Sequence, residues 1–212
     1  MAGITVEYMD HMGSDLSTVN AARVSFGKAK AEFDEADAKL VKYLTDHRHM
    51  TPFRHNQVQL RCKVPIFLAR QLGKHQAGLS WNEVSRRYVD SEPEFYIPEE
   101  WRARPTGSVK QGSGEAHQDS EHWARSYQVA VQSAVWEYQD MIDGGIAPEM
   151  ARMVLPQSML TEWVWSGNLL AFAHVYRERI DPHAQQEAQE FARALDAVIR
   201  PLFPVTWEAL VG

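Results

Sequence analysis

Residues 57–64, QVQLRCKV, followed at once by PIFLARQLGKH at 65–75, decide the fold class of this chain. Every even-numbered residue from 58 to 64 is apolar and every odd-numbered residue from 57 to 63 is polar. A two-residue repeat of this kind predicts a β-strand with one buried face. Pro65 stops the strand and suits the first turn of a helix. The sequence therefore predicts a strand that leads directly into a short, buried helix.

Other segments show the helical repeat or the strand repeat more weakly. Alternation at residues 4–9 predicts a short opening strand, and residues 35–48 place Leu40, Val41 and Leu44 on one helical face. A long helix is expected from about 123 to 141, closed by two glycines at 144–145. Pro148 begins another helix, whereas residues 158–168, SMLTEWVWSGN, are typical of a strand or a helix.

The last predicted helix occupies residues 181–201, DPHAQQEAQEFARALDAVIRP. Asp181 is expected to cap it and Pro182 to take its first position. Its inner face is expected to consist of Ala184, Ala188, Phe191, Leu195 and Val198. Residues 101–116 hold three glycines, one proline and little apolar bulk, so a mobile surface loop is expected there.

Length and composition set the class of protein. A chain of 212 residues with 44% hydrophobic content suits one domain spanning residues 1–212, and helices dominate over strands. We therefore expect an α+β fold in which a small mixed or antiparallel sheet is flanked by helices. The net charge of −6 argues against a nucleic-acid-binding surface, and no apolar run is long enough to span a membrane. No signal peptide is recognisable in residues 1–13.

The chain has one cysteine and nine histidines. Cys62 lies on the apolar face of the predicted strand, so it is expected to be an inert core residue. A single cysteine forms no internal disulfide, which favours a reducing compartment such as the cytoplasm, or a host cytoplasm if a phage encodes the chain. His47, His49 and His55 cluster in the sequence, but they form no zinc-binding motif, and no metal site is predicted.

Residues 74–90, KHQAGLSWNEVSRRYVD, concentrate charged and hydrogen-bonding side chains directly after the predicted helix. Ser85, Arg87 and nearby backbone N–H groups combine a hydroxyl, a two-pronged guanidinium and free amides. Such a set can satisfy several oxygens of a phosphate group. The alternative is that Arg87, Arg152 and Arg179 are ordinary surface arginines in salt bridges. On residue types alone, both interpretations stay open.

Several blocks of the chain resemble, in the same order, those of the flavin-dependent thymidylate synthases. The segment SxNExSRRY at 80–88 is similar to the end of that family's signature, RHRxxSxNxxSxR. The other blocks are AARVSFGK (21–28), HMTPFRH (49–55), ARMVLP (151–156), SGN (166–168) and RIDPHAQQE (179–187). The resemblance therefore covers nearly the whole chain.

Two departures from the family pattern concern the flavin side of the implied site. Lys74, His75 and Gln76 stand where the family has Arg-His-Arg, and one extra residue precedes Ser80. Lysine keeps the charge of arginine without its planar fork, and glutamine loses the charge. Arg54 stands where an acid usually follows the PF pair.

The resemblance implies a set of binding residues for dUMP and another for FAD. The implied dUMP set is Gln71, Lys74, Glu83, Val84, Ser85, Arg87, Arg152 and Arg179. The implied FAD set is Ser25, Thr51, His75, Gln76, Asn82, Asn168, His174 and His183. Arg179 and Ser85 are the implied catalytic residues, with Arg179 at the pyrimidine and Ser85 at the phosphate. In the family, a homotetramer shares its sites between subunits.

The implied reaction is the reductive methylation of dUMP to dTMP. FAD carries electrons from NADPH, methylenetetrahydrofolate supplies the carbon, and no cysteine attacks the uracil, in agreement with the expected burial of Cys62. Two alternatives are a flavin-dependent dUMP hydroxymethylase on the same scaffold and a catalytically silent flavin- or nucleotide-binding protein. The products formed from dUMP distinguish all three.

Overall fold

The computed structural model describes residues 3–89, 91–106 and 112–212. Its centre is a four-stranded sheet in which every neighbouring pair of strands is antiparallel. In spatial order the strands are β1 (Thr5–Met12), β2 (Gln57–Pro65), β4 (Leu160–Asn168) and β3 (Leu79–Glu83). This arrangement confirms the α+β class and the antiparallel sheet.

The predicted strand at 57–64 is β2, an inner strand. Val58, Leu60, Cys62 and Val64 are each at most 1% exposed, as the alternation predicts. β2 pairs with β4 over its full length, from Gln57 opposite Asn168 to Pro65 opposite Leu160. Residues 158–168, for which the sequence left strand and helix open, thus contain the second inner strand.

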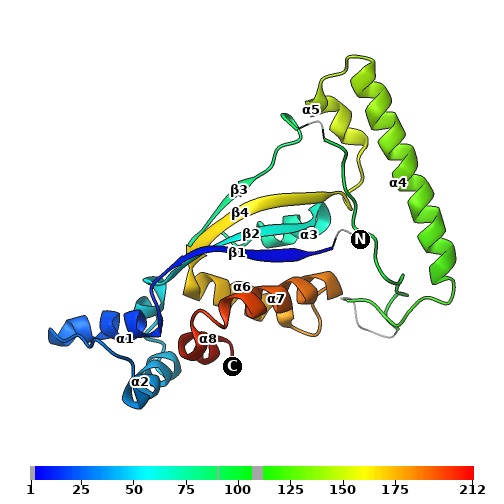
Figure 1. Ribbon diagram of the computed structural model, residues 1–212. Helices are drawn as coiled ribbons and strands as arrows, with labels where there is room; N and C mark the ends of the chain where they lie inside the picture. The colour runs from blue at the N-terminus through cyan, green and yellow to red at the C-terminus, as the bar shows by residue number, and fades with distance from the viewer. Residues whose placement is uncertain (1–2, 90, 107–111) are drawn as a thin grey trace.

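Helices cover the sheet and extend beyond both of its ends. Figure 1 shows α6 and α7 lying along one face of the strands. Trp165 of β4 contacts Phe172 of α6 and Phe191 of α7, with ring centroids 5.4 and 6.2 Å apart. The helices are α1 (Asp15–Arg23), α2 (Glu35–Asp46), α3 (Ile66–Leu72), α4 (Ser120–Asp143), α5 (Pro148–Ala151), α6 (Leu169–Ile180), α7 (Gln186–Ile199) and α8 (Pro204–Val211), with short 3-10 turns η1 (Val24–Phe26), η2 (Thr51–Arg54) and η3 (Arg152–Val154).

The predicted start of the last helix is wrong. α7 begins at Gln186 with Gln185 as its N-cap, five residues after Asp181. The Asp181 carboxylate instead accepts a hydrogen bond from the backbone of His183 at 2.7 Å, and its carbonyl accepts one from Ala184. These contacts close a turn between α6 and α7, because a short acidic side chain satisfies its own local backbone. Ala188, Phe191 and Leu195 are fully buried as predicted, while Ala184, outside the helix, and Val198 are partly buried against the core.

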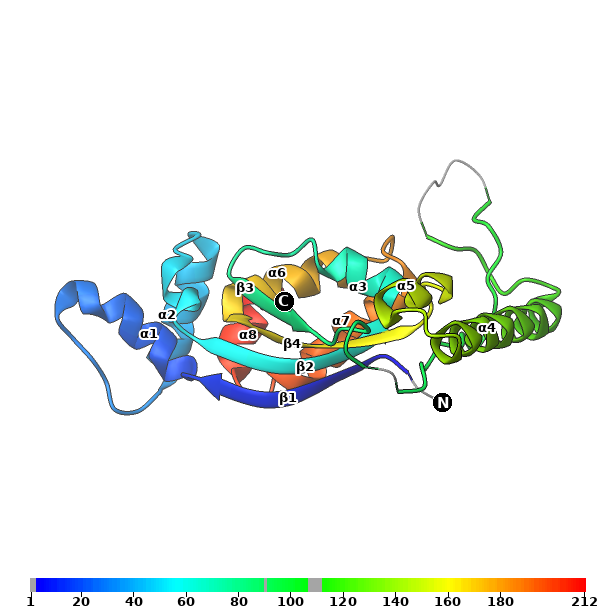
Figure 2. The same ribbon diagram turned by 90° about the horizontal axis from the view of Figure 1, so that it is seen from above.

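The molecule is elongated. In both Figure 1 and Figure 2, α1 and α2 project at one end of the sheet and α4 and α5 at the other. The long predicted helix is confirmed as α4, but much of its apolar surface faces solvent: Trp136 is 66% and Trp123 47% exposed. The predicted loop at 101–116 falls partly on residues 107–111, outside the described residues. Its described flanks are joined by an isolated bridge between Arg102 and Ala116.

Candidate active site

An open pocket of about 560 Å³ lies where α3, β3 and β4 meet. Trp81 and Trp165 are the aromatic residues of its wall, and the Trp81 ring is held by stacking on Trp163 of β4 with ring centroids 3.8 Å apart. Lys74, His75 and Gln76 supply the polar side. The full lining is Ile66, Ala69, Arg70, Gly73, Lys74, His75, Gln76, Leu79, Trp81, Glu83 and Trp165.

Arg179, near the C-terminal end of α6, reaches the end of α3. Its Nε and Nη2 donate to Nε2 of His75 at 3.0 and 2.9 Å, and Nη2 also approaches the backbone oxygen of Gln71 at 3.5 Å. His174, five residues earlier on α6, meets the His75 ring edge-to-face with ring centroids 5.6 Å apart. The fold therefore brings four of the predicted residues together, Gln71 from α3, His75 from the turn after α3, and His174 and Arg179 from the distant α6.

His75 is held as a neutral ring. Burial, the charge of Arg179 and the neighbouring His174 lower the pKa of His75 to about 4. Because both Arg179 contacts are donors, Nε2 of His75 is the acceptor and Nδ1 carries the proton. Arg179 is thereby fixed without neutralising its positive charge.

Nuclear magnetic resonance titration of the His75 ring should show it still neutral at pH 5.5. In Arg179→Ala the pKa of His75 should rise, because one of the lowering charges is gone, yet stay below 6.5 because burial remains. Between pH 6.5 and 4, His75 is protonated in the unfolded chain but stays neutral in the folded chain. The free energy of unfolding therefore falls as the pH is lowered through this range. A His75 pKa near 6.5 in the wild type would contradict this assignment.

A tight turn connects the end of the Lys74-His75-Gln76 segment to β3. Gly78 has φ +77°, and a Cβ added there would lie 2.3 Å from Nδ2 of Asn168. The backbone of Asn168 donates to the Gly78 oxygen at 3.1 Å, while its side chain caps α6 by accepting from Ala171 at 2.9 Å. The turn thus brings Asn168 close to Leu79, which lines the pocket.

Ser85 and Arg87 contact each other just beyond β3. The Ser85 hydroxyl oxygen accepts from Nε of Arg87 at 3.2 Å, and the Arg87 guanidinium lies 5.0 Å from the centre of the Tyr88 ring. Glu83, the last residue of β3, accepts hydrogen bonds from Thr161 and from Trp81. The cation and hydroxyl of the predicted phosphate cradle are therefore adjacent and solvent-accessible.

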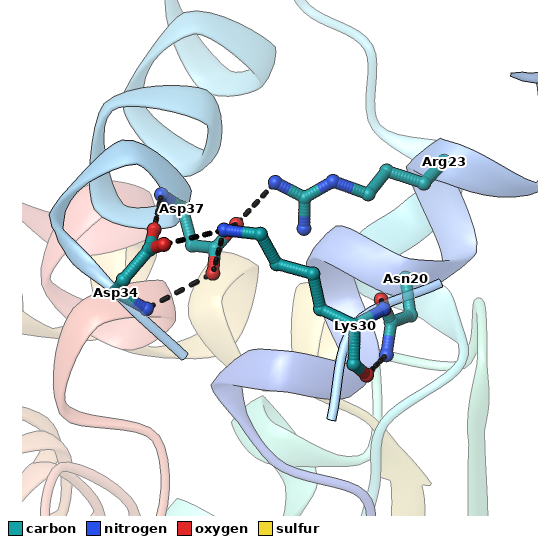
Figure 3. Close-up of polar contacts among 5 residues, drawn as sticks. All are labelled: Asn20, Arg23, Lys30, Asp34 and Asp37. Atoms are coloured by element: carbon teal, nitrogen blue, oxygen red, sulfur yellow. Dashed lines mark hydrogen bonds and ion pairs between the residues drawn. The ribbon is translucent and has the colours of Figure 1, made fainter. Parts of the chain in front are cut away.

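Ser25 lies on η1, in a loop tied to α2 by an ion cluster (Figure 3). Asp37 is fully buried and pairs with Arg23 and Lys30, while Lys30 also contacts Asp34 at 2.6 Å. Burial by itself would raise the pKa of Asp37, but its hydrogen bonds to Arg23, to the backbone of Asp34 and to Lys30 lower it overall. The cluster holds the two ends of the loop that carries Ser25.

One chain does not gather every predicted site residue. The α1–α2 end carries η1, and the opposite end carries α5 and η3, to which Arg152 belongs (Figure 1). His183 lines a different pocket, next to Gln186 and Arg193. Thr51 and Val84 are exposed, on η2 and after β3 respectively, and Asn82 is exposed near the end of β3.

Sequence reasoning missed a hydrogen-bonded relay behind Gln71. Nε2 of Gln71 donates to Oε1 of Gln185 at 2.6 Å, and Nε2 of Gln185 donates to Oε2 of Glu187 at 2.8 Å. Oε1 of Glu187 pairs with Arg102 at 2.6 Å. The signal was present in the AQQE segment, whose polar residues directly precede the apolar face of α7.

Cys62 has no access to the pocket. Its side chain is fully buried within β2, and burial raises the pKa of its thiol far above the ordinary value. Among the described histidines, His47 and His49 stack with Tyr43, at ring distances of 4.0 and 6.2 Å. Within the described ranges no group of three or more potential ligands could hold a metal ion. None of the helices in the same ranges combines the length and the apolar character that a membrane span requires.

Comparison with known sequences decides the family. The family described as "Thymidylate synthase complementing protein" matches residues 7–205. The chain belongs to this family. Within the family, a relative from Thermus thermophilus, named flavin-dependent thymidylate synthase, is 39% identical over 96% of this chain and 74% of its own length. A relative of the same name from Kosmotoga olearia is 38% identical over 98% of this chain and 90% of its own length.

A solved structure of a family-like fold agrees with the sequence comparison. It is the crystal structure of the UMP/dUMP methylase PolB from Streptomyces cacaoi bound with 5-Br dUMP. Its TM-score is 0.87 with 33% sequence identity, and the match covers 98% of this chain and 94% of that chain. The resemblance to flavin-dependent thymidylate synthases stated from the sequence blocks is thus confirmed.

Proposed function

We propose that this chain is a flavin-dependent thymidylate synthase that converts dUMP to dTMP, with methylenetetrahydrofolate as carbon donor and NADPH as reductant. The observation that carries the proposal is the meeting of Gln71, His75 and Arg179 at one place in a chain of this family. Support for a flavin and for dUMP comes from the names of the relatives and from the bound nucleotide analogue in the solved structure.

The donor set suits a flavin beside an anionic nucleotide. Trp81, held by stacking on Trp163, offers a rigid wall to the pocket, and the positive φ of Gly78 brings backbone close to Asn168. His75, Gln76 and Asn168 would hold FAD, which when bound supplies hydride chemistry. Arg179 would place a fixed cation at the pyrimidine and stabilise negative charge on its oxygens. Ser85 and Arg87 would bind the phosphate.

The proposed reaction needs no cysteine nucleophile. Replacing Cys62 with alanine should leave turnover substantially intact, because the buried thiol lies within an inner strand. The free energy of unfolding should fall by about 1 to 2 kcal/mol, the usual scale for trimming a core side chain. Steady-state kinetics and urea unfolding measure the two effects. Covalent capture of Cys62 by 5-fluoro-dUMP would contradict the proposal directly.

We further propose that the active unit is a homotetramer. Ser25 and Arg152 belong to opposite ends of one elongated chain, so a site containing both requires another copy (Figures 1 and 2). The exposed Trp123, Val129 and Trp136 of α4 give that helix an apolar surface suited to burial between chains. Light scattering combined with size-exclusion chromatography measures the molar mass of the assembly, which should be that of four chains.

Product analysis tests the function. Purified protein should be yellow and release FAD on heating, and with dUMP, NADPH and methylenetetrahydrofolate it should form dTMP. Hydroxymethyl-dUMP would support the hydroxymethylase alternative, and no product from FAD-loaded protein would support the silent one. Neither alternative is favoured by the relatives and structures named above, which are synthases or methylases. Because the PolB structure is titled a UMP/dUMP methylase, UMP belongs in the same assay.

A further inference from the structure

The relay behind Gln71 has a fixed direction. Glu187 is only 4% exposed, and as a carboxylate it can only accept hydrogen bonds. One of its oxygens is paired with Arg102 and the other takes the NH₂ group of Gln185. With its NH₂ group directed to Glu187, Gln185 has its oxygen left to face Gln71. The NH₂ group of Gln71 must therefore be the donor of that contact.

The orientation of the Gln71 side-chain amide is therefore fixed by Gln185 and Glu187. Gln71 directs its NH₂ group to Gln185, and no hydrogen bond within the described part of the chain uses the Gln71 side-chain oxygen. Gln71 is half-buried, and its backbone oxygen lies 3.5 Å from the Arg179 guanidinium. The chain thus offers an acceptor, the Gln71 side-chain oxygen, on a residue whose backbone oxygen contacts the Arg179 guanidinium, a group that only donates.

Resting on the proposed function, we propose that Gln71 is a specificity-determining residue that reads the N3–H of uracil with its amide oxygen, and that Gln185 and Glu187 are positioning residues that fix this orientation. Apart from any proton on its phosphate, dUMP carries two hydrogen-bond donors, N3–H on the ring and the 3′-hydroxyl on the sugar. The neighbouring Arg179, assigned to the pyrimidine oxygens, places Gln71 at the ring. Cytosine has an unprotonated N3 and would meet the Gln71 oxygen with a second acceptor.

A fixed Gln71 amide would allow the site to reject cytosine. A site whose buried polar group pairs with the correct substrate leaves that group unpaired with the wrong one, which costs more than the lost hydrogen bond alone. An unconstrained glutamine could turn its amide by 180° and donate to cytosine N3 instead. The carboxylate of Glu187 prevents this, because a turned Gln71 would set its oxygen against the oxygen of Gln185.

The test compares dissociation constants of dUMP and dCMP for FAD-loaded wild type, Glu187→Gln and a control, Glu190→Gln. Glu190 is an exposed acid of the same helix and makes no hydrogen bond to Gln185 among the described contacts. In Glu187→Gln the preference for dUMP over dCMP should fall about tenfold, the worth of one hydrogen bond and its unpaired partner. In Glu190→Gln the preference should stay at the wild-type value.

A second variant covers the case in which Glu187→Gln does not fold. Gln185→Leu cuts the relay next to Gln71 and keeps the Arg102–Glu187 pair, and it should lower the same preference. If either variant weakens both nucleotides by the same factor, the relay is only structural or Gln71 reads the sugar, and the proposal is overturned. Wild-type protein that binds neither nucleotide would overturn the proposed function itself.

Discussion

Arg179→Ala is expected to lower turnover at saturating dUMP by about 10²- to 10³-fold, the scale seen when one preorganised donor to a developing negative charge is removed. The guanidinium is held by His75. Because the pKa of His75 is about 4, the imidazole ring is neutral and leaves the positive charge of Arg179 uncompensated. Its interaction with the ring oxygens strengthens as negative charge develops there, so the transition state loses more than the ground state. Single-turnover oxidation of the reduced flavin by dUMP and the folate measures the step.

Two variants of the same helix give the comparison. Arg177→Ala, an exposed residue one half-turn away, should leave turnover unchanged. Arg179→Lys keeps the charge without the fork that reaches His75 and should lie between wild type and alanine. Wild-type turnover in Arg179→Ala, with FAD still bound, would remove Arg179 from the chemistry.

Arg87→Ala should mainly weaken dUMP binding, by roughly 1.5 to 3 kcal/mol, or about 10- to 150-fold in the dissociation constant. A contact between guanidinium and phosphate exists in ground and transition states alike, so the turnover number at saturation should change little. Arg86→Ala is the matched control: the Arg86 guanidinium donates to the backbone oxygens of Ser91 and Glu92 and is turned to its own loop.

Isothermal titration calorimetry with dUMP measures the affinity of each variant and so distinguishes the role of Arg87 from that of Arg86. An Arg87→Ala protein that binds dUMP with wild-type affinity would show that the Ser85–Arg87 pair is not the phosphate cradle. A loss of turnover without a loss of affinity would place Arg87 at the reacting ring instead. Raised salt should reduce the difference between Arg87→Ala and wild type, because the lost contact is between charges.

Local patterns predicted those elements whose environment follows a simple repeat. β2 alternates strictly because it has one face toward the core and one toward polar neighbours, and the structure confirms it. β4 was ambiguous because its outward residues include Val164, which is partly buried like the others on that face. β3 was not predicted, since its polar residues at 80, 82 and 83 hide the half-buried Leu79 and Trp81 of an edge strand.

Tertiary contacts explain the remaining differences. Nothing in the sequence pattern shows that Asp181 follows α6 directly and must close a turn before α7 can begin. Arg179 and His75 were assigned to separate ligands through the family blocks, whereas their direct contact depends on how α3 and α6 pack. The relay through Gln185 needs three side chains from α3, the turn before α7 and α7 itself, which no local repeat encodes.

The burial of the one cysteine gives the protein a built-in reporter of its own unfolding. Cys62 is fully enclosed on an inner strand, paired on one side with Val6 and on the other with Trp163. A thiol reagent can reach it only when the sheet around it opens, so the labelling rate of the native protein reports how often β2 becomes accessible. Fluorescent maleimide labelling over a urea series would therefore yield the opening free energy from a single position, without any engineered probe.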